Sequence, residues 1–424
     1  MPLIWRIFVS PKVSEGYYYT LSPVCYTDQM FLKESGIGFE EILLKYVYKD
    51  PKPLTGTELK ALAANVARLS GLLTRERETL PAEYLKDEGL RRAYVLYFLL
   101  SNLYKIHIPL RELSLHPSNL LSKERLRILD IGSGPGTAIL GIMDFFSAKE
   151  KRPVLEFTAI DHVKENLRDS EALFGLLRER VSMAATLKTI KSSVEMVASF
   201  PEGPYDIIVL SNILNEVARL DEDRTSKRVA ILKTVISDLL AADGSCIIIE
   251  PALRQTSRDM LEVRDGLLDE GFCIYSPCLM GEKCPALQNP KDWCHEDIPW
   301  EFPEIIREVD GLIGLRKDSL KFSYLVIRKD GLSIKDIYGD SSFRVVSESL
   351  VSKGKVEFYV CGKEGRRLVT RLDKDKGIKN KAFEDLRRGD MVGFEAVIDE
   401  GKRLRVGKDT NVVSLDERIC CQRR

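Results

Sequence analysis

A run of glycines at residues 130–136, Asp-Ile-Gly-Ser-Gly-Pro-Gly, restricts the possible folds more than any other part of the sequence. It follows a short apolar segment, 126–131, that is typical of a buried strand, and precedes a stretch of helical character that runs through Phe146. In a strand, glycine loop and helix taken in this order, backbone amides can approach a ligand closely. The sequence therefore predicts an α/β domain with a binding loop after its first strand.

Two groups of α/β proteins have such a loop. Dinucleotide enzymes place a pyrophosphate at the helix N-terminus, whereas methyltransferases place the methionine part of S-adenosylmethionine beside a loop led by an acidic residue. Asp130 at the strand end and Pro135 inside the loop resemble the methyltransferase form. Asp161, which ends the second strand, is then expected to accept both ribose hydroxyls, and a tight turn without a ligand is the alternative. The residues expected to bind this cofactor are Asp130, Gly132, Ser133, Gly134, Gly136, Asp161 and Asn212.

Strands and helices alternate along the middle of the chain. Apolar segments that are typical of strands lie at 126–131, 154–160, 186–190, 205–210, 245–249, 272–275 and 322–327. Such alternation predicts a parallel sheet with helices on both faces. Together with the glycine loop it predicts a class I S-adenosylmethionine methyltransferase-like, Rossmann-like α/β fold.

The length of 424 residues predicts two or three domains. Residues 36–122 have apolar positions at helical spacing and predict an α-helical domain. The methyltransferase-like domain is expected at 123–330, with a cysteine-rich insertion at 277–320. A small β-domain is expected at 331–424, with an oligonucleotide-binding (OB) barrel as its candidate form. Residues 1–35 show no clear period and are left unassigned. The tyrosines expected in the core of the helical domain are Tyr94, Tyr97 and Tyr104.

The formal net charge is zero, so no overall field attracts the protein to nucleic acid, and an RNA-binding face has to come from a local patch. Residues 331–424 contain 21 Lys and Arg against 16 Asp and Glu, which fits a solvated surface and an RNA contact equally well. The arginines concerned are Arg366, Arg367, Arg371, Arg387 and Arg388. With no apolar segment of membrane-spanning length and no signal or transit peptide pattern, we expect a cytoplasmic protein.

Three of the nine cysteines, Cys278, Cys284 and Cys294, lie close together in the sequence, with five and nine residues between them. This spacing matches no standard zinc ribbon or ferredoxin run, so it fits metal ligands and chance thiols equally well. A closed site needs a fourth ligand, and Cys361 is the best candidate by residue type, with His295 as a weaker one. Cys246 and Cys273 are expected as buried strand residues.

No catalytic group can be identified. The fourth strand is followed by neither an Asn-Pro-Pro-aromatic motif, which base-amino methylation commonly uses, nor a cysteine that could attack a pyrimidine. Asn212, Asn215 and Glu216 follow that strand, where ligands bind in open α/β sheets. An asparagine there also fits a helix cap, and the two interpretations carry equal weight.

Several motifs between about residue 60 and residue 400 resemble the methyltransferase-like assembly factors of the small ribosomal subunit, a family best known from mitochondria, with prokaryotic relatives. They are Tyr84-Leu85 through Ala93-Tyr94, the loop 130–136, Asn212–Glu216, Pro277-Cys278, Cys284-Pro285, Asp292-Trp293-Cys294-His295, Lys321–Leu325, Cys361-Gly362 and Arg388-Gly389-Asp390. After His295 the chain departs from the family, because Glu296 and Asp297 stand where members often have Phe and Arg-rich residues.

The resemblance implies that Cys278, Cys284, Cys294 and Cys361 hold a [4Fe–4S] cluster and that the protein acts on the maturing small subunit through its rRNA. Zinc is the alternative metal, since four thiolates suit both. The acidic residues after His295 weaken the case for RNA contact by this loop. No membrane partner is expected, and the protein is expected to be a monomer.

Two other functions compete with this one. The first is active S-adenosylmethionine-dependent methyl transfer to a small molecule or a protein. The second is a redox or iron sensor in which the cluster gates RNA binding. Co-sedimentation with small subunits argues against the first, and ribosome binding that changes on cluster loss supports the second.

Overall fold

The computed structural model describes residues 36–50, 52–76 and 84–416. Its chain divides into two compact units. In the described range, the larger unit comprises residues 36–340 and the short segment 361–366, and the smaller unit comprises 341–360 and 367–416. Cys361 therefore belongs to the larger unit, together with the other three cysteines of interest.

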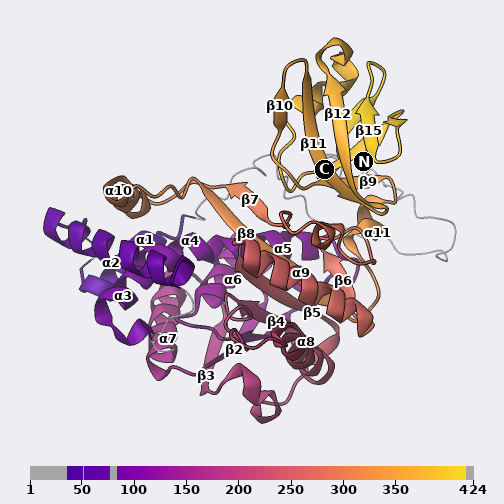
Figure 1. Ribbon diagram of the computed structural model, residues 1–424. Coiled ribbons are helices and arrows are strands. Elements are labelled where there is room, and N and C mark those ends of the chain that lie inside the picture. The colour runs from indigo at the N-terminus through magenta and orange to yellow at the C-terminus, as the bar shows by residue number, and fades with distance from the viewer. Residues whose placement is uncertain (1–35, 51, 77–83, 417–424) are drawn as a thin grey trace, which may run out of the picture. The chain divides into compact units, whose positions relative to one another are not determined.

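The N-terminal part of the larger unit is helical (Figure 1). Its helices are α1 (Phe39–Tyr48), α2 (Gly56–Thr74), α3 (Glu88–Ala93), α4 (Leu100–Leu103) and α5 (His107–Leu113). The Thr55 side chain caps α2 and Glu58 completes a capping box, so two otherwise unsatisfied backbone donors are paired. Between α3 and α4 the chain forms a wider π-helical turn, η3 (Tyr94–Leu99).

A mostly parallel sheet forms the centre of the larger unit. Its strands run in the order β3-β2-β1-β4-β5-β8-β6, and β7 pairs with β8. β8 is antiparallel to both β5 and β6, whereas β1 to β5 are mutually parallel. The bounds are β1 (Arg125–Ile131), β2 (Val154–Asp161), β3 (Ala185–Lys191), β4 (Tyr205–Ser211), β5 (Leu240–Pro251), β6 (Cys273–Ser276), β7 (Glu296–Pro299) and β8 (Ser319–Arg328).

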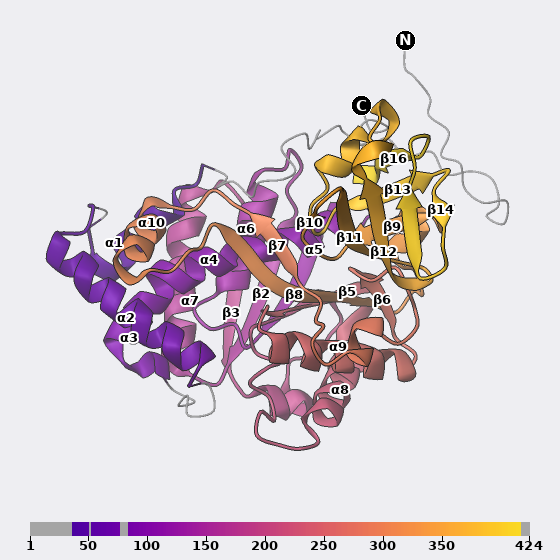
Figure 2. The same ribbon diagram turned by 45° about the horizontal axis from the view of Figure 1, so that its top comes forward.

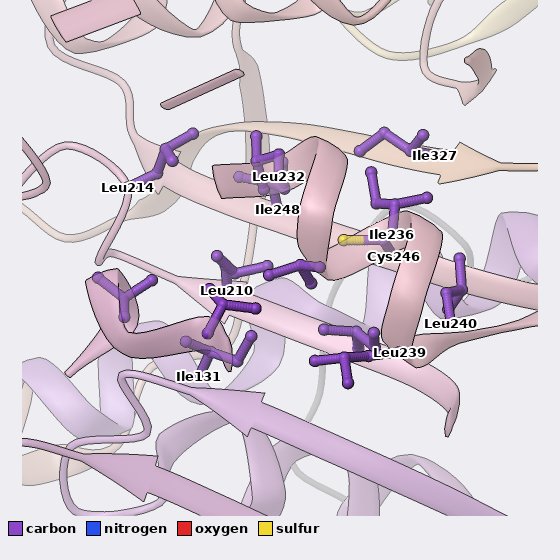
Figure 3. Close-up of a cluster of buried hydrophobic side chains, with 14 of the residues drawn as sticks. Ile131, Leu210, Leu214, Leu232, Ile236, Leu239, Leu240, Cys246, Ile248 and Ile327 are labelled. Carbon is purple, nitrogen blue, oxygen red and sulfur yellow. The ribbon is translucent and has the colours of Figure 1, made fainter. Parts of the chain in front are cut away.

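Alternating strand residues build the core on one face of this sheet. Leu210, Cys246 and Ile248 pack there against Leu232 and Ile236 of the helical segment above them (Figure 3). The helices on this face are α8 (Arg224–Thr234), η7 (Val235–Leu239) and α9 (Arg254–Asp269). Helix α6 (Thr137–Ser147) connects β1 to β2, and α7 (Lys164–Arg180) connects β2 to β3. Helix α6 also contacts α4 and α5 (Figure 2).

The strand order reverses between β1 and β4, because β2 and β3 lie on one side of β1 and β4 and β5 on the other. Ligands of open α/β sheets bind at the carboxyl ends of the strands at such a switch point. The sheet therefore confirms the expected methyltransferase-like α/β fold, and it places the ends of β1, β2 and β4 at one edge. The parallel arrangement expected from the sequence holds for β1 to β5, and β8 departs from it because it runs antiparallel to β5.

The insertion between β6 and β8 contains η8 (Pro285–Gln288), strand β7 and helix α10 (Glu304–Ile313). Helix α11 (Ile334–Tyr338) ends the described part of the larger unit before residue 341. Within the described residues, no helix combines the length and the apolar character needed to cross a membrane.

The smaller unit is built from one eight-stranded sheet, with the order β14-β15-β12-β11-β9-β13-β16 and β10 paired to β11. The pair β12–β15 is parallel, and Phe358, Phe383 and Val392 lie in the core. A β-domain at the C-terminus is thus present, and its OB type stays a prediction. The strands are β9 (Ser342–Val345), β10 (Leu350–Ser352), β11 (Lys355–Gly362), β12 (Gly365–Leu372), β13 (Met391–Glu395), β14 (Ile398–Asp399), β15 (Arg403–Val406) and β16 (Asn411–Ser414).

Candidate cofactor and metal sites

The three loop glycines adopt the left-handed conformation that favours glycine, with φ of 68° at Gly132, 54° at Gly134 and 86° at Gly136. A Cβ on Gly132 would meet the Ile213 side chain at 2.5 Å, and one on Gly136 would meet the Ser170 Oγ atom at 2.6 Å. A Cβ on Gly134 would meet no atom within 4 Å. The outer glycines therefore permit close packing, whereas the middle glycine faces open space.

Backbone hydrogen bonds fix this loop against the end of β2. The amides of Gly132 and Ser133 both donate to the Ile160 carbonyl, at 2.8 and 3.0 Å. The amide of Gly134 donates to Asp161 Oδ2 at 2.9 Å, and Gly136 N closes a turn onto Ser133 O at 2.9 Å. The loop is therefore held in shape by the neighbouring strand.

Asp161 is buried at the end of β2 and accepts three hydrogen bonds. Besides Gly134 N, its carboxylate accepts from Val163 N at 2.8 Å and from Asn166 Nδ2 at 3.2 Å. A carboxylate has about four lone-pair positions. In this arrangement it has room for about one further donor, rather than for the two ribose hydroxyls expected from the sequence.

Asp130 lies at the end of β1 with 1% of its surface exposed. Burial and then the nearby Asp161 raise the pKa of its carboxyl to about 8. Neither carboxylate oxygen has a hydrogen-bond partner among the described residues. Because buried polar groups are normally paired, this carboxyl fits a ligand that brings a hydrogen-bond donor or a positive charge.

The end of β4 lies beside the loop and presents Asn212 in a left-handed conformation, φ 60°. Its amide donates to the Ile249 carbonyl at 2.8 Å, and its side chain reaches Ser211 Oγ at 3.4 Å. The residues that follow form turns, and α8 begins only at Arg224, so the helix-cap interpretation of Asn212 is wrong. Asn215 is buried and donates to Glu250 Oε2 at 2.5 Å, which ties the ends of β4 and β5 together.

Tyr94 is a member of this site that the sequence did not reveal. Its hydroxyl interacts with Thr137, the first residue of α6, and with the carboxyls of Glu216, Asp161 and Asp130. Burial, then Glu216, raise the pKa of Tyr94 to about 12. The prediction of core packing holds for the fully buried Tyr97 and Tyr104 and misses this role of Tyr94.

The four cysteines of interest interact electrostatically in the larger unit. Burial raises the pKa of the Cys294 thiol well above its usual range, and Cys284, Cys278 and Cys361 raise it further. Burial, then Cys278 and Cys284, raise the pKa of Cys361 to about 12. All four are free thiols. The chain thus brings together the residues expected as ligands, including the one remote in sequence.

The geometry stops short of a formed metal site. Within the described ranges, no group of three or more His, Cys, Asp or Glu side chains is arranged to hold a metal ion. His295 stacks on Trp293 with ring centroids 5.8 Å apart. Cys246 is fully buried in β5, as expected. Cys273 is only partly buried, contrary to expectation, and its thiol donates to the Leu332 carbonyl at 3.2 Å.

Four of the arginines considered for RNA contact have structural partners, and one of them, Arg388, forms an ion pair with Glu348 at 3.2 Å and donates to Val346 O at 2.6 Å. Arg371 is buried and donates to Asn380 O at 3.1 Å and to Glu384 Oε1 at 2.9 Å. Arg366 forms an ion pair with Asp292 at 2.5 Å, and Arg367 forms one with Asp399 at 2.9 Å. An RNA-contact role is therefore wrong for Arg371, whose side chain is not available at the surface.

Comparison with known proteins gives one family and several methyltransferase structures. The model of a family described as mitochondrial small ribosomal subunit Rsm22 matches residues 108–393. No curated protein matches the sequence.

Two solved structures illustrate the structural likeness. The plantazolicin methyltransferase BamL, in complex with a triazolic desmethylPZN analog and SAH, is 14% identical, with 65% of this chain and 99% of that chain covered and a TM-score of 0.33. A putative class I S-adenosylmethionine-dependent methyltransferase from Listeria monocytogenes is 13% identical, with 69% and 84% covered and a TM-score of 0.33.

Proposed function

The chain belongs to the Rsm22 family of the mitochondrial small ribosomal subunit, and from this premise we propose that it binds S-adenosylmethionine and acts in small-subunit assembly through rRNA. The observation that carries the cofactor assignment is the arrangement of residues at the switch point of the sheet. It combines the open space over Gly134 with the buried, unpartnered carboxyl of Asp130.

The residues present fit this cofactor. S-adenosylmethionine brings a sulfonium charge and an amino group, which suit Asp130, and ribose hydroxyls, one of which suits the remaining position on Asp161. Asn212 and Tyr94 border the same edge of the sheet. When bound, the cofactor supplies an activated methyl group, while the chain holds it and surrounds it with polar groups.

We further propose that Cys278, Cys284, Cys294 and Cys361 hold a metal centre, a [4Fe–4S] cluster in preference to zinc. The support is the donor set, four thiols in one electrostatic group, together with the family resemblance. Protein purified without oxygen should be brown and contain iron, whereas colourless protein with zinc would point to the alternative metal.

The partner follows from the family, whose name places it at the small ribosomal subunit. We propose that the contact is made through rRNA and that the protein is a monomer. The family name points to mitochondria and so argues against the expected cytoplasmic location. Purified protein should co-sediment with isolated small subunits in a sucrose gradient and not with large subunits. Equal binding to both, or to neither, would contradict the proposed function.

A further inference from the structure

Helix α9 organises the cysteine-rich insertion through two arginines. Arg258 donates from Nη1 to three insertion carbonyls, Ala286 at 3.2 Å, Asn289 at 2.9 Å and Asp292 at 2.7 Å. It also donates from Nη2 to Leu287 O at 3.3 Å. These contacts satisfy the carbonyls of an irregular segment, which has few backbone partners of its own.

Arg264 lies further along the same helix and is fully buried. Its Nη2 donates to Met280 O at 2.7 Å and its Nη1 to Glu282 O at 2.6 Å. Its Nε donates to the Cys278 Sγ atom at 3.3 Å. Arg264 therefore holds the backbone after Cys278 and contacts the sulfur atom itself, whereas Arg258 donates to carbonyl oxygens.

The neighbouring Asp265 completes the arrangement. It pairs with Arg264 Nη1 at 2.5 Å and accepts the Cys284 amide at 3.1 and 3.0 Å. Two adjacent helix residues thus hold two of the four cysteines, one at its thiol and the other at its backbone. A buried guanidinium is costly without compensation, and here the Asp265 carboxylate, two backbone carbonyls and the Cys278 sulfur atom are its partners.

We propose that Arg264 is the positioning residue of the four-cysteine site: it orients the Cys278 sulfur and balances the negative charge of the thiolates. The inference rests on the proposed metal centre. Hydrogen bonds to ligand sulfurs and nearby charge set the reduction potential of iron–sulfur centres, and groups that orient ligands strengthen metal binding. A donor with positive charge stabilises the more negative, reduced state, so Arg264 raises the potential.

The test compares Arg264→Gln with Arg258→Gln, a matched variant on the same helix that loosens the same insertion without touching sulfur. Metal retention against a chelator and, for iron, the midpoint potential are measured on the full chain. We expect Arg264→Gln to bind metal about 10–100-fold more weakly and its potential to fall. Arg258→Gln should keep the wild-type potential.

Two results would overturn the inference. One is an unchanged affinity and potential in Arg264→Gln, and the other is the same change in both variants, which would show a structural role only. Arg264→Lys is the control for misfolding of the Gln variant, because it keeps the positive charge. It should retain metal, and its midpoint potential should fall less than that of Arg264→Gln. Wild-type protein that binds no metal at all would instead refute the proposed metal centre on which the inference rests.

Discussion

At the scale of single residues, the site is defined by carboxyls that the fold keeps away from water. Asp130 has the largest expected effect on stability and binding, because its pKa of about 8 means that its carboxyl is mostly protonated at neutral pH without a ligand. Above that pH the ionised carboxyl is buried and unpaired, which is unfavourable. The same residue therefore lowers the stability of the free protein and favours a cationic ligand.

Asp130→Asn tests this trade-off. The folded-state pKa lies above the unfolded value, so the wild-type protein loses stability as pH rises from about 4 to about 8. The variant lacks this loss, and its melting temperature should exceed that of the wild type by more at pH 8 than at pH 5. Its S-adenosylmethionine affinity should be weaker. A melting-temperature difference that does not depend on pH would contradict the role of Asp130.

Tyr94→Phe and Tyr97→Phe form a matched pair within one π-helical turn. Removing the Tyr94 hydroxyl should reduce cofactor affinity by up to about tenfold, since one hydrogen bond contributes about 0.5–1.5 kcal/mol, and should leave stability nearly unchanged. Tyr97 donates to Asp310 at 2.5 Å, so its variant should lose about 1–3 kcal/mol of stability and keep its affinity. Calorimetry and denaturant melts distinguish the two, and identical profiles would place Tyr94 in the core.

At the scale of elements, the glycine loop separates packing from binding. Gly132→Ala should destabilise the protein, because the left-handed backbone costs about 1–2 kcal/mol and the new Cβ would overlap Ile213. Gly134→Ala has the same backbone cost without the overlap. It should stay folded and lose cofactor affinity. If the Gly134 variant binds like the wild type while folded, the open space over Gly134 is not the cofactor site.

The sequence predicted most strands of the central sheet well because they are buried apolar runs, whereas the polar strand β7 was not predicted. Expected segments such as 126–131 and 205–210 agree with the observed strands to within a few residues. Other features have no local signal. The antiparallel course of β8 depends on sheet pairing, and the π-helical turn that carries Tyr94 toward Asp130 and Asp161 looks like ordinary helix in the sequence.

The site was predicted in its residues more than in its geometry. Asp130 and Asp161 could be predicted because each ends a strand. The three N–H groups that donate to the Asp161 carboxylate could not be predicted, because they depend on the conformation of the loops around it. The thiols of Cys278 and Cys361 interact although 82 residues separate them in the numbering. From the sequence, only the residue type and the family resemblance indicate that these two cysteines belong to the same site.

At the scale of the whole molecule, RNA binding has to come from local charge because the net charge is zero. With Arg371 buried, the better candidates are exposed lysines of the smaller unit, Lys374, Lys379 and Lys381. Replacing all three with Ala should flatten the log–log salt dependence of rRNA binding by about 2, at about 0.7 per contact for single strands. An unchanged slope would move the RNA-binding face to another part of the molecule.

Isothermal titration calorimetry of the purified, metal-loaded chain tests whether the switch point of the sheet binds S-adenosylmethionine. We expect saturable binding with one site per chain, weakened in both Asp130→Asn and Gly134→Ala. We also expect bound cofactor to raise the melting temperature of the protein by mass action. The absence of binding heat and of any cofactor-induced melting shift in a well-folded wild-type protein would contradict cofactor binding at this site.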